Sequence, residues 1–201
     1  PHMDYVAMAG DVVRLLDRLE LDAATLLGHS MGGEVAMTLA LTHPQRAHRL
    51  VAVDIAPVTY PDRFSGIIAT LRALPLATLR TRAEADAHLA AALDDAALRA
   101  FLLANLEREG DGWRWRVDLP AIAANLPAIM TFPAPLAGAR YAGRALFLRG
   151  GASPAVLPAH GPVIRGLFPD AAVDTIEGAG HWPHVDSRAE FVARLTAFLD
   201  D

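Results

Sequence analysis

Apolar residues follow two different spacings along this chain, one typical of helices and one typical of buried strands. A first helix is predicted from an apolar stripe at helical spacing that comprises Tyr5, Met8, Val12, Leu15, Leu16 and Leu19. Residues 24–27 (ATLL) follow as an apolar run without alternation, which indicates a strand buried on both faces of a parallel sheet. A second helix is predicted from Met31 as far as His43, because the residue before Pro44 is pushed out of the helical conformation.

A second buried-strand pattern covers residues 50–55 (LVAVDI), in which Asp54 is the one carboxylate. Open parallel sheets bind their ligands at the C-terminal ends of the strands, so this position makes Asp54 a candidate site residue. The following stretch consists of Ala-, Leu- and Arg-rich helical segments, interrupted by prolines and by a Gly-Asp-Gly turn at 110–112. This change of pattern indicates a helical insertion.

Strand patterns return at residues 145–148 (ALFL) and 172–176 (AVDTI), so the sheet continues beyond the helical insertion. The sequence therefore predicts an α/β protein with a mostly parallel, doubly wound sheet and a helical lid inserted between its strands. We assign residues 1–56 to the first part of the sheet domain, residues 57–143 to the lid and residues 144–201 to the second part of the sheet domain.

Composition and charge exclude several kinds of binding partner and several kinds of catalytic group. The chain has 201 residues, 53% of them hydrophobic, which is enough for one substantial core. Its net charge of −5 and the lack of any Lys/Arg run argue against a nucleic-acid partner. No cysteine is present, so thiol nucleophiles and cysteine-ligated zinc are excluded. No apolar stretch approaches the roughly 18 residues of a membrane span and no signal segment opens the chain, so we expect a soluble, cytoplasmic protein without membrane contact.

Residues 28–32 (GHSMG) fit the pattern G-x-S-x-G and lie between a predicted strand and a predicted helix. A serine at such a turn must adopt a strained backbone conformation with its hydroxyl exposed, and glycines beside it let the strand and the helix approach closely. A pattern with only three fixed positions also occurs by chance in unrelated sequences. The position of this one between a strand and a helix nevertheless favours a catalytic Ser30. The backbone N–H of Met31, directly after the nucleophile, is then one donor of an oxyanion hole.

A serine hydroxyl is a weak nucleophile unless a histidine takes its proton. Among the eight histidines, His181 lies in a glycine-rich loop (GAGHW, residues 178–182) after the last predicted strand, where a side chain can project over the sheet edge. The other histidines occupy positions where a structural role is the ordinary interpretation. His181 and His184 are close in sequence, but no third ligand accompanies the pair to suggest a metal site. Asp54 lies at the C-terminal end of a predicted strand and can hold the histidine in the required tautomer.

The chain resembles the α/β-hydrolase superfamily, and more narrowly the YbfF-like bacterial esterases and their mitochondrial relatives, in four segments: residues 27–33, 53–57, 110–115 and 178–182. This resemblance implies a hydrolase for esters or thioesters that needs no cofactor. It implies that Ser30 attacks the substrate, that His181 acts first as base and then as acid, and that Asp54 orients His181. Many such hydrolases carry the acid after a later strand; here residues 148–155 contain no Asp or Glu, which also resembles this group.

The front of the chain departs from the family pattern. Members of the superfamily begin with further strands and a His-Gly loop that donates the second backbone N–H of the oxyanion hole, and no such loop precedes Ser30 here. We therefore expect that the N-terminal strands are missing, which would leave an open apolar edge on the sheet. A separate N-terminal polypeptide would supply them, or the chain is a fragment of a longer precursor.

The lid is rich in large apolar residues, which at helical spacing serve packing more often than a substrate pocket. We assign four candidate substrate contacts: His29, Trp113, Trp115 and Trp182. The expected substrate is a small-molecule ester or an acyl thioester. Two other reactions on the same three residues remain open, carbon–carbon bond hydrolysis and cofactor-free haloperoxidation. A non-catalytic interaction module that lacks a complete oxyanion hole is the third alternative.

Overall fold

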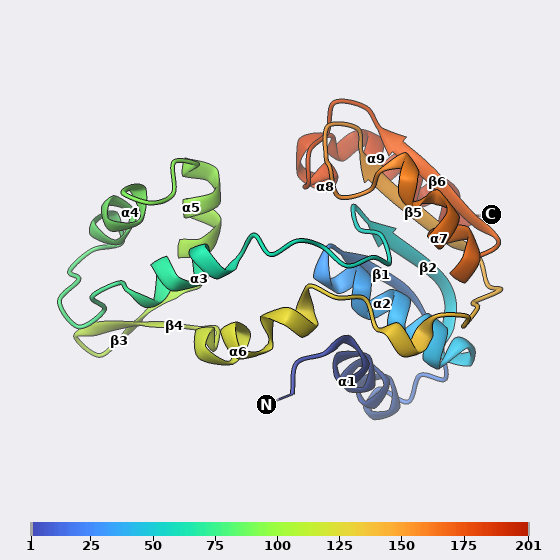
Figure 1. Cartoon of the computed structure of the whole chain (residues 1–201), viewed down its shortest axis with the longest axis horizontal. Coiled ribbons are helices and arrows are strands. Elements are labelled where there is room, and N and C mark those ends of the chain that lie inside the picture. Colours follow the sequence, from blue (N-terminus) through green and yellow to red (C-terminus); the bar gives the residue numbers. More distant parts are fainter. Residues whose placement is uncertain (1, 201) are drawn as a thin grey trace. The chain divides into compact units, whose positions relative to one another are not determined.

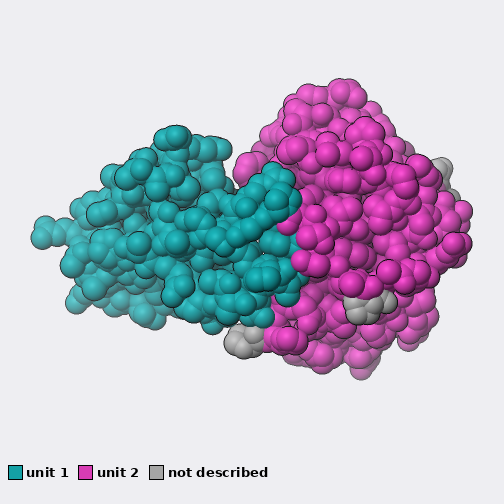
Figure 2. Space-filling model, in the orientation of Figure 1, with its two compact units in different colours: residues 1, 61–130 teal, residues 2–60, 131–201 magenta. Residues whose placement is uncertain are grey.

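The computed structural model describes residues 2–200, apart from the side chain of residue 135. The first and last segments predicted from the sequence also include residues 1 and 201, which lie outside the described residues. The chain forms two compact units, residues 61–130 (unit 1) and residues 2–60 with 131–201 (unit 2) (Figure 2). Within the described part of the chain, no helix has both the length and the apolar character needed to cross a bilayer.

Unit 2 contains a four-stranded sheet in which all neighbouring strands are parallel. Its strands are β1 (Ala24–His29), β2 (Ala47–Val53), β5 (Ala145–Gly150) and β6 (Ala171–Ile176), in the spatial order β1-β2-β5-β6. The connections between neighbouring strands contain helices, as parallel pairing requires. The C-terminal ends of β1, β2 and β5 therefore lie at one edge of the sheet (Figure 1).

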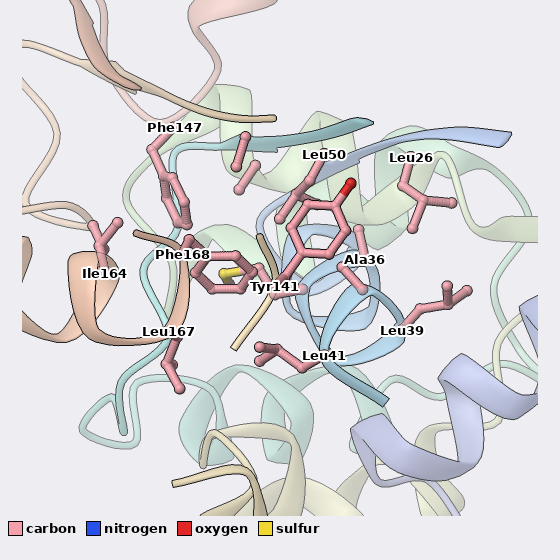
Figure 3. Packing of buried hydrophobic residues seen from close by; sticks show 14 of the residues in the cluster. Leu26, Ala36, Leu39, Leu41, Leu50, Tyr141, Phe147, Ile164, Leu167 and Phe168 are labelled. Atoms are coloured by element: carbon pink, nitrogen blue, oxygen red, sulfur yellow. The ribbon is translucent and has the colours of Figure 1, made fainter. Parts of the chain in front are cut away.

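Three helices and the larger core of unit 2 belong to one face of the sheet. The helices are α1 (Tyr5–Arg18), α2 (Met31–Thr42) and α7 (Gly161–Leu167). Each helix contributes buried side chains to one cluster with Leu50 and Phe147 of the sheet, both fully buried. Figure 3 shows the residues that α2 and α7 contribute, among them Leu39 and Ile164. Short 3-10 turns at Pro44–Arg46, Ala134–Leu136 and Pro158–His160 lie in the connections of this unit.

The opposite face of the sheet is covered by α9 (Arg188–Asp200), which follows the short helix α8 (Pro183–Asp186). Phe191 packs there in a second cluster with alternate residues of β2 and β5, among them Val51 and Leu148. Leu50 and Val51 thus point to opposite faces, as the two-residue period of a strand demands. Helices on both faces of a parallel sheet confirm the predicted α/β-hydrolase type of fold.

Strand β1 differs from its prediction as a strand buried on both faces. Thr25 and Leu27 are exposed, Leu27 to 48%, because β1 lies at the edge of the sheet and the cluster under α9 contains no β1 residue. The stripe predicted for the first helix is also partly wrong, since Leu15 and Leu19 are about half exposed whereas Ala9 is buried. Local apolar runs therefore overestimated burial on this side of unit 2.

Unit 1 is held by its own apolar cluster and is not purely helical. Its elements are α3 (Ser65–Arg72), α4 (Arg82–Ala90), α5 (Ala96–Leu103), β3 (Leu106–Glu109), β4 (Gly112–Trp115) and α6 (Leu119–Ile129). The antiparallel pair β3–β4 encloses the predicted Gly-Asp-Gly turn, where Gly110 has a φ of 57°. Residues 57–60 and 131–143, which the sequence analysis assigned to the lid, belong to unit 2.

Candidate active site

Ser30 occupies the sharp turn between the end of β1 and the start of α2. Its φ of 53° and ψ of −121° confirm the strained backbone predicted for this position. A Cβ on Gly28 would collide with the carbonyl of Gly32, and a Cβ on Gly33 would collide with the side chain of Ile55. By contrast, a Cβ on Gly32 would meet no atom within 4 Å. The close approach of strand and helix therefore depends on Gly28 and Gly33.

In residues 2–200, the start of α2 leaves the backbone N–H of Met31 free beside Ser30. The carbonyl of Ser30 accepts hydrogen bonds from the N–H groups of Gly33 (2.8 Å) and Glu34 (3.2 Å), which close the first helical turn. Among the described residues the N–H of Met31, the first residue of α2, has no hydrogen-bond acceptor. An unpaired N–H at a helix N-terminus favours negative charge, so this group can stabilise an oxyanion.

His181 lies in the loop after β6 and bridges Ser30 and Asp54. Its Nε2 is 3.1 Å from the Ser30 Oγ, and its Nδ1 is 2.7 Å from the Asp54 Oδ2. The loop turns at Gly178, whose φ is 73°. Two residues later, the backbone N–H of Gly180 donates a hydrogen bond of 2.8 Å to the Asp186 carboxylate. The structure thus brings together the three residues that the sequence analysis selected.

Asp54 directly follows β2 and is completely buried. Its Oδ1 accepts a hydrogen bond from the N–H of Gly150 (2.9 Å), and its Oδ2 accepts from His181 and from the Ser153 hydroxyl. Burial alone would raise the pKa of Asp54, but hydrogen bonds from His181, Ser153 and Gly150 hold that pKa below its usual range. Asp54 is therefore ionised, and its carboxylate accepts three hydrogen bonds, while its backbone N–H donates to the carbonyl of Leu148.

Ser153 and Gly150 are site residues that the sequence analysis did not select. Both lie in the segment 148–155, which was noted only for its lack of Asp and Glu. The segment instead supplies two donors to the carboxylate that comes from the neighbouring strand. The sequence signal for this arrangement was a serine within a segment where an acid is expected, and the structure shows that this serine is buried.

The candidate substrate contacts are distributed over both units. His29 and Trp182 lie in unit 2 beside His181, at ring-centroid distances of 4.8 Å and 6.1 Å. Trp113 and Trp115 lie on β4 of unit 1, where their indole N–H groups donate to the carbonyls of Leu79 (3.1 Å) and Leu71 (3.2 Å). Packing within unit 1 accounts for the positions of these two tryptophans. No group of three or more His, Asp or Glu side chains in residues 2–200 has the arrangement of a metal site.

Comparisons with known proteins identify the family to which the chain is similar. Residues 1–187 match the family described as the alpha/beta hydrolase fold. The chain is 42% identical over 205 residues to the sn-1-specific diacylglycerol lipase ABHD11 of Mus musculus, covering 99% of this chain and 66% of the relative. It is 35% identical over 202 residues to the esterase YbfF of Escherichia coli, covering 100% of this chain and 77% of the relative.

A solved structure is similar to almost the whole chain. The structure titled marine microorganism esterase superposes with a TM-score of 0.92 at 33% sequence identity, covering 98% of this chain and 77% of the other. The chain thus spans about two thirds of the length of the mouse lipase and about three quarters of the length of the two esterases. By name, one of these relatives is a diacylglycerol lipase and the other two are esterases.

Proposed function

Because this chain belongs to the alpha/beta hydrolase fold family, we propose that it hydrolyses esters through an acyl-enzyme formed on Ser30. The observation that carries the proposal is the unbroken line of hydrogen bonds from the Ser30 hydroxyl through His181 to Asp54, with distances of 3.1 Å and 2.7 Å. Both distances lie within the range needed for proton transfer and for holding the histidine tautomer. The esterase and lipase names of the relatives support ester bonds as the substrate.

In the acylation step, the Ser30 Oγ attacks the ester carbonyl carbon while its proton passes to the His181 Nε2. Asp54 accepts the Nδ1–H of His181 and stabilises the imidazolium that forms. The negative oxygen of the tetrahedral intermediate faces the Met31 N–H. When the intermediate collapses, the carbon–oxygen bond to the alcohol breaks, and His181 returns its proton to the departing alkoxide.

In the deacylation step, a water molecule takes the place of the alcohol. His181 removes one proton from that water, and the resulting hydroxide attacks the acyl carbon bound to Ser30. Collapse of the second tetrahedral intermediate releases the carboxylic acid, and the Ser30 Oγ recovers its proton from His181. Each residue is thus returned to its starting protonation state.

The proposed substrate class is a carboxylic ester with an apolar acyl group. The names of the relatives specify esters, and one specifies the sn-1 ester of diacylglycerol. Acyl thioesters undergo the same two steps, and the comparison that carries a thioesterase name is only 18% identical, so it indicates the fold alone. We therefore place acylglycerols and simple carboxylesters first among the substrates to test.

We also propose that the free edge of β1 pairs with a strand of a further polypeptide segment. Among the described residues β1 pairs only with β2, and the apolar side chain of Leu27 is 48% exposed in the middle of the strand. Unpaired parallel edges are normally covered in α/β sheets. Intact-mass analysis of an active, monodisperse sample tests this: a monomer containing only these 201 residues would contradict the pairing.

The experiment that tests the proposed function is labelling with a fluorophosphonate, which reacts only with activated serines. We expect a stoichiometric adduct on Ser30, lost in Ser30→Ala, together with turnover of a p-nitrophenyl ester that the same variant abolishes. Ser65→Ala in unit 1 is the matched control, because its exposed hydroxyl donates to Asp62 and forms no hydrogen bond with a histidine in residues 2–200. An unlabelled chain that hydrolyses no ester would instead indicate a non-catalytic module.

A further inference from the structure

His29 is held against the main chain of His181 in a manner that its sequence position did not reveal. It is the last residue of β1 and directly precedes Ser30. Its Nε2 lies 2.7 Å from the carbonyl oxygen of His181, so the ring donates an N–H to that oxygen. The His29 ring is also tilted against the His181 ring at 4.8 Å and meets the His184 ring edge-on at 4.9 Å.

This hydrogen bond connects the turn that carries Ser30 directly to the loop that carries His181. Ser30 is one peptide bond from His29, and the oxygen that His29 binds belongs to His181 itself, 152 positions away in the sequence. The His181 ring is fixed separately at Nδ1 by Asp54, and its loop is fixed at Gly180 by Asp186. The Ser30 turn and the His181 backbone therefore cannot separate without breaking the His29 bond.

We infer that His29 is a positioning residue, which acts through His181 by holding its backbone so that Nε2 stays within reach of the Ser30 hydroxyl. This inference rests on the proposed function of Ser30 and His181 and adds a residue that the triad does not include. It replaces the expectation that His29 contacts the substrate. The His29 ring uses its Nε2–H for a protein carbonyl, which leaves that group unavailable to a substrate.

The chemistry of the site also favours a neutral ring at position 29. Burial lowers the pKa of His29, and the neighbouring His181 and His184 lower it further, against the opposing effects of the His181 carbonyl and Asp54. A neutral His29 with its proton on Nε2 can donate to the carbonyl without placing a second positive charge beside the imidazolium of His181. A neutral donor of the same reach is therefore what the position requires.

Substitutions at His29 distinguish the effect of a hydrogen-bond donor at the right distance from Cα from the effect of an aromatic ring at this position. The amide nitrogen of Gln is four bonds from Cα, as is the His Nε2, whereas the amide nitrogen of Asn is one bond shorter. We expect His29→Gln to keep most of the wild-type kcat for a p-nitrophenyl ester. We expect His29→Asn and His29→Phe to lose kcat by on the order of 10²-fold with little change in KM, because a small displacement of the base suffices for such a loss.

His184→Phe is the matched control, because it keeps an aromatic ring against His29 and the His184 side chain makes no hydrogen bond among the described residues. We expect that variant to keep wild-type kcat and KM. Two results would overturn the inference: equal kcat in the Gln, Asn and Phe variants, or a rise in KM alone, which would place His29 in contact with substrate.

A second measurement is independent of turnover and keeps this inference distinct from the proposed function. Long-range proton–nitrogen NMR correlation of the full chain reports which ring nitrogen of each histidine carries the proton. We expect His29 to be protonated at Nε2 alone at neutral pH, and the His181 ring signals to move in His29→Phe but not in His29→Gln. Protonation of His29 at Nδ1 alone would overturn the inference even if the chain is an active esterase. If the chain hydrolyses no ester, the proposed function fails while this spectrum still decides the role of His29.

Discussion

The two units bury very different kinds of side chain. In the described residues, four polar side chains are buried, and all of them belong to unit 2: Glu34, Thr38, Asp54 and Ser153. The buried side chains of unit 1 are apolar, with Leu89 and others forming its single cluster. Unit 2 therefore has to satisfy polar groups in its interior, whereas unit 1 is stabilised by ordinary apolar packing.

The four polar side chains of unit 2 are not equally well satisfied. The Asp54 carboxylate accepts hydrogen bonds from the Ser153 hydroxyl and from His181, and the Ser153 Oγ in turn accepts one from the N–H of Ala155. The Glu34 Oε2 and the Thr38 Oγ1, one helical turn apart on α2, have no hydrogen-bond partner in the described part of the chain. A buried polar atom without a partner costs about 1–3 kcal/mol. Unit 2 thus contains a satisfied set of buried polar side chains, Asp54 and Ser153, which serves the site. It also contains an unsatisfied set, Glu34 and Thr38, which lowers the stability of the fold.

The largest expected effect comes from Asp54, at the centre of the satisfied set. Asp54→Asn keeps the size of the side chain but presents an amide to His181, which favours the wrong tautomer, so kcat for ester hydrolysis should fall by about 10⁴-fold. Asp86→Asn removes a partly exposed carboxylate that pairs with Arg99 in unit 1, and it should leave kcat unchanged. Steady-state kinetics on both variants provide the measurement. Comparable losses in the two would show that the contrast between the units has no catalytic meaning.

The second effect concerns Glu34, in the unsatisfied set. Burial raises the pKa of Glu34 from 4.5 to about 9, so the folded chain keeps a proton that the unfolded chain releases. The contribution of this group to stability is complete below pH 4.5 and is lost as the pH rises toward 9. Its loss should lower the free energy of unfolding by about 1.4 kcal/mol per pH unit across that window.

Urea unfolding of wild type and Glu34→Gln at pH 6, 7 and 8 measures this slope. The wild-type curve should lose about 2–3 kcal/mol relative to the variant over those two pH units, because the amide does not titrate. Glu84→Gln, at an exposed position near the start of α4 in unit 1, should run parallel to wild type. If wild type and Glu34→Gln keep a constant difference at all three pH values, Glu34 is charged in the folded protein.

The sequence predicted most of the elements of unit 2 and the three residues that the structure brings together. The spacing of apolar residues located α2 and the strands β2, β5 and β6. The G-x-S-x-G motif predicted the strained backbone of Ser30. These predictions depend on local sequence alone. The exposure of Leu27 does not, because it follows from the position of β1 at the sheet edge, which the apolar run ATLL cannot encode.

Two features of the site and of unit 1 were missed for different reasons. The bond from Ser153 to Asp54 joins residues 99 positions apart, so only the folded loop reveals it. The β3–β4 pair had a local signal, a glycine turn followed by Trp113 and Trp115 in alternation, but the surrounding helical composition obscured it. The hydrogen bond from His29 was missed for the same reason as that from Ser153, since its acceptor is a backbone carbonyl of a distant loop.

The smallest expected effect lies in unit 1, at Trp115. Trp115→Phe removes the indole N–H that binds the Leu71 carbonyl, but that carbonyl still accepts from the N–H of Leu74, so the cost should be about 1 kcal/mol. Hydrogen exchange followed by mass spectrometry should show faster exchange in peptides from residues 61–130 and unchanged exchange in unit 2. Kinetics on the same variant should show unchanged KM. A rise in KM would mean that Trp115 contacts the substrate, as the sequence first suggested, and faster exchange in both units would mean that they unfold together.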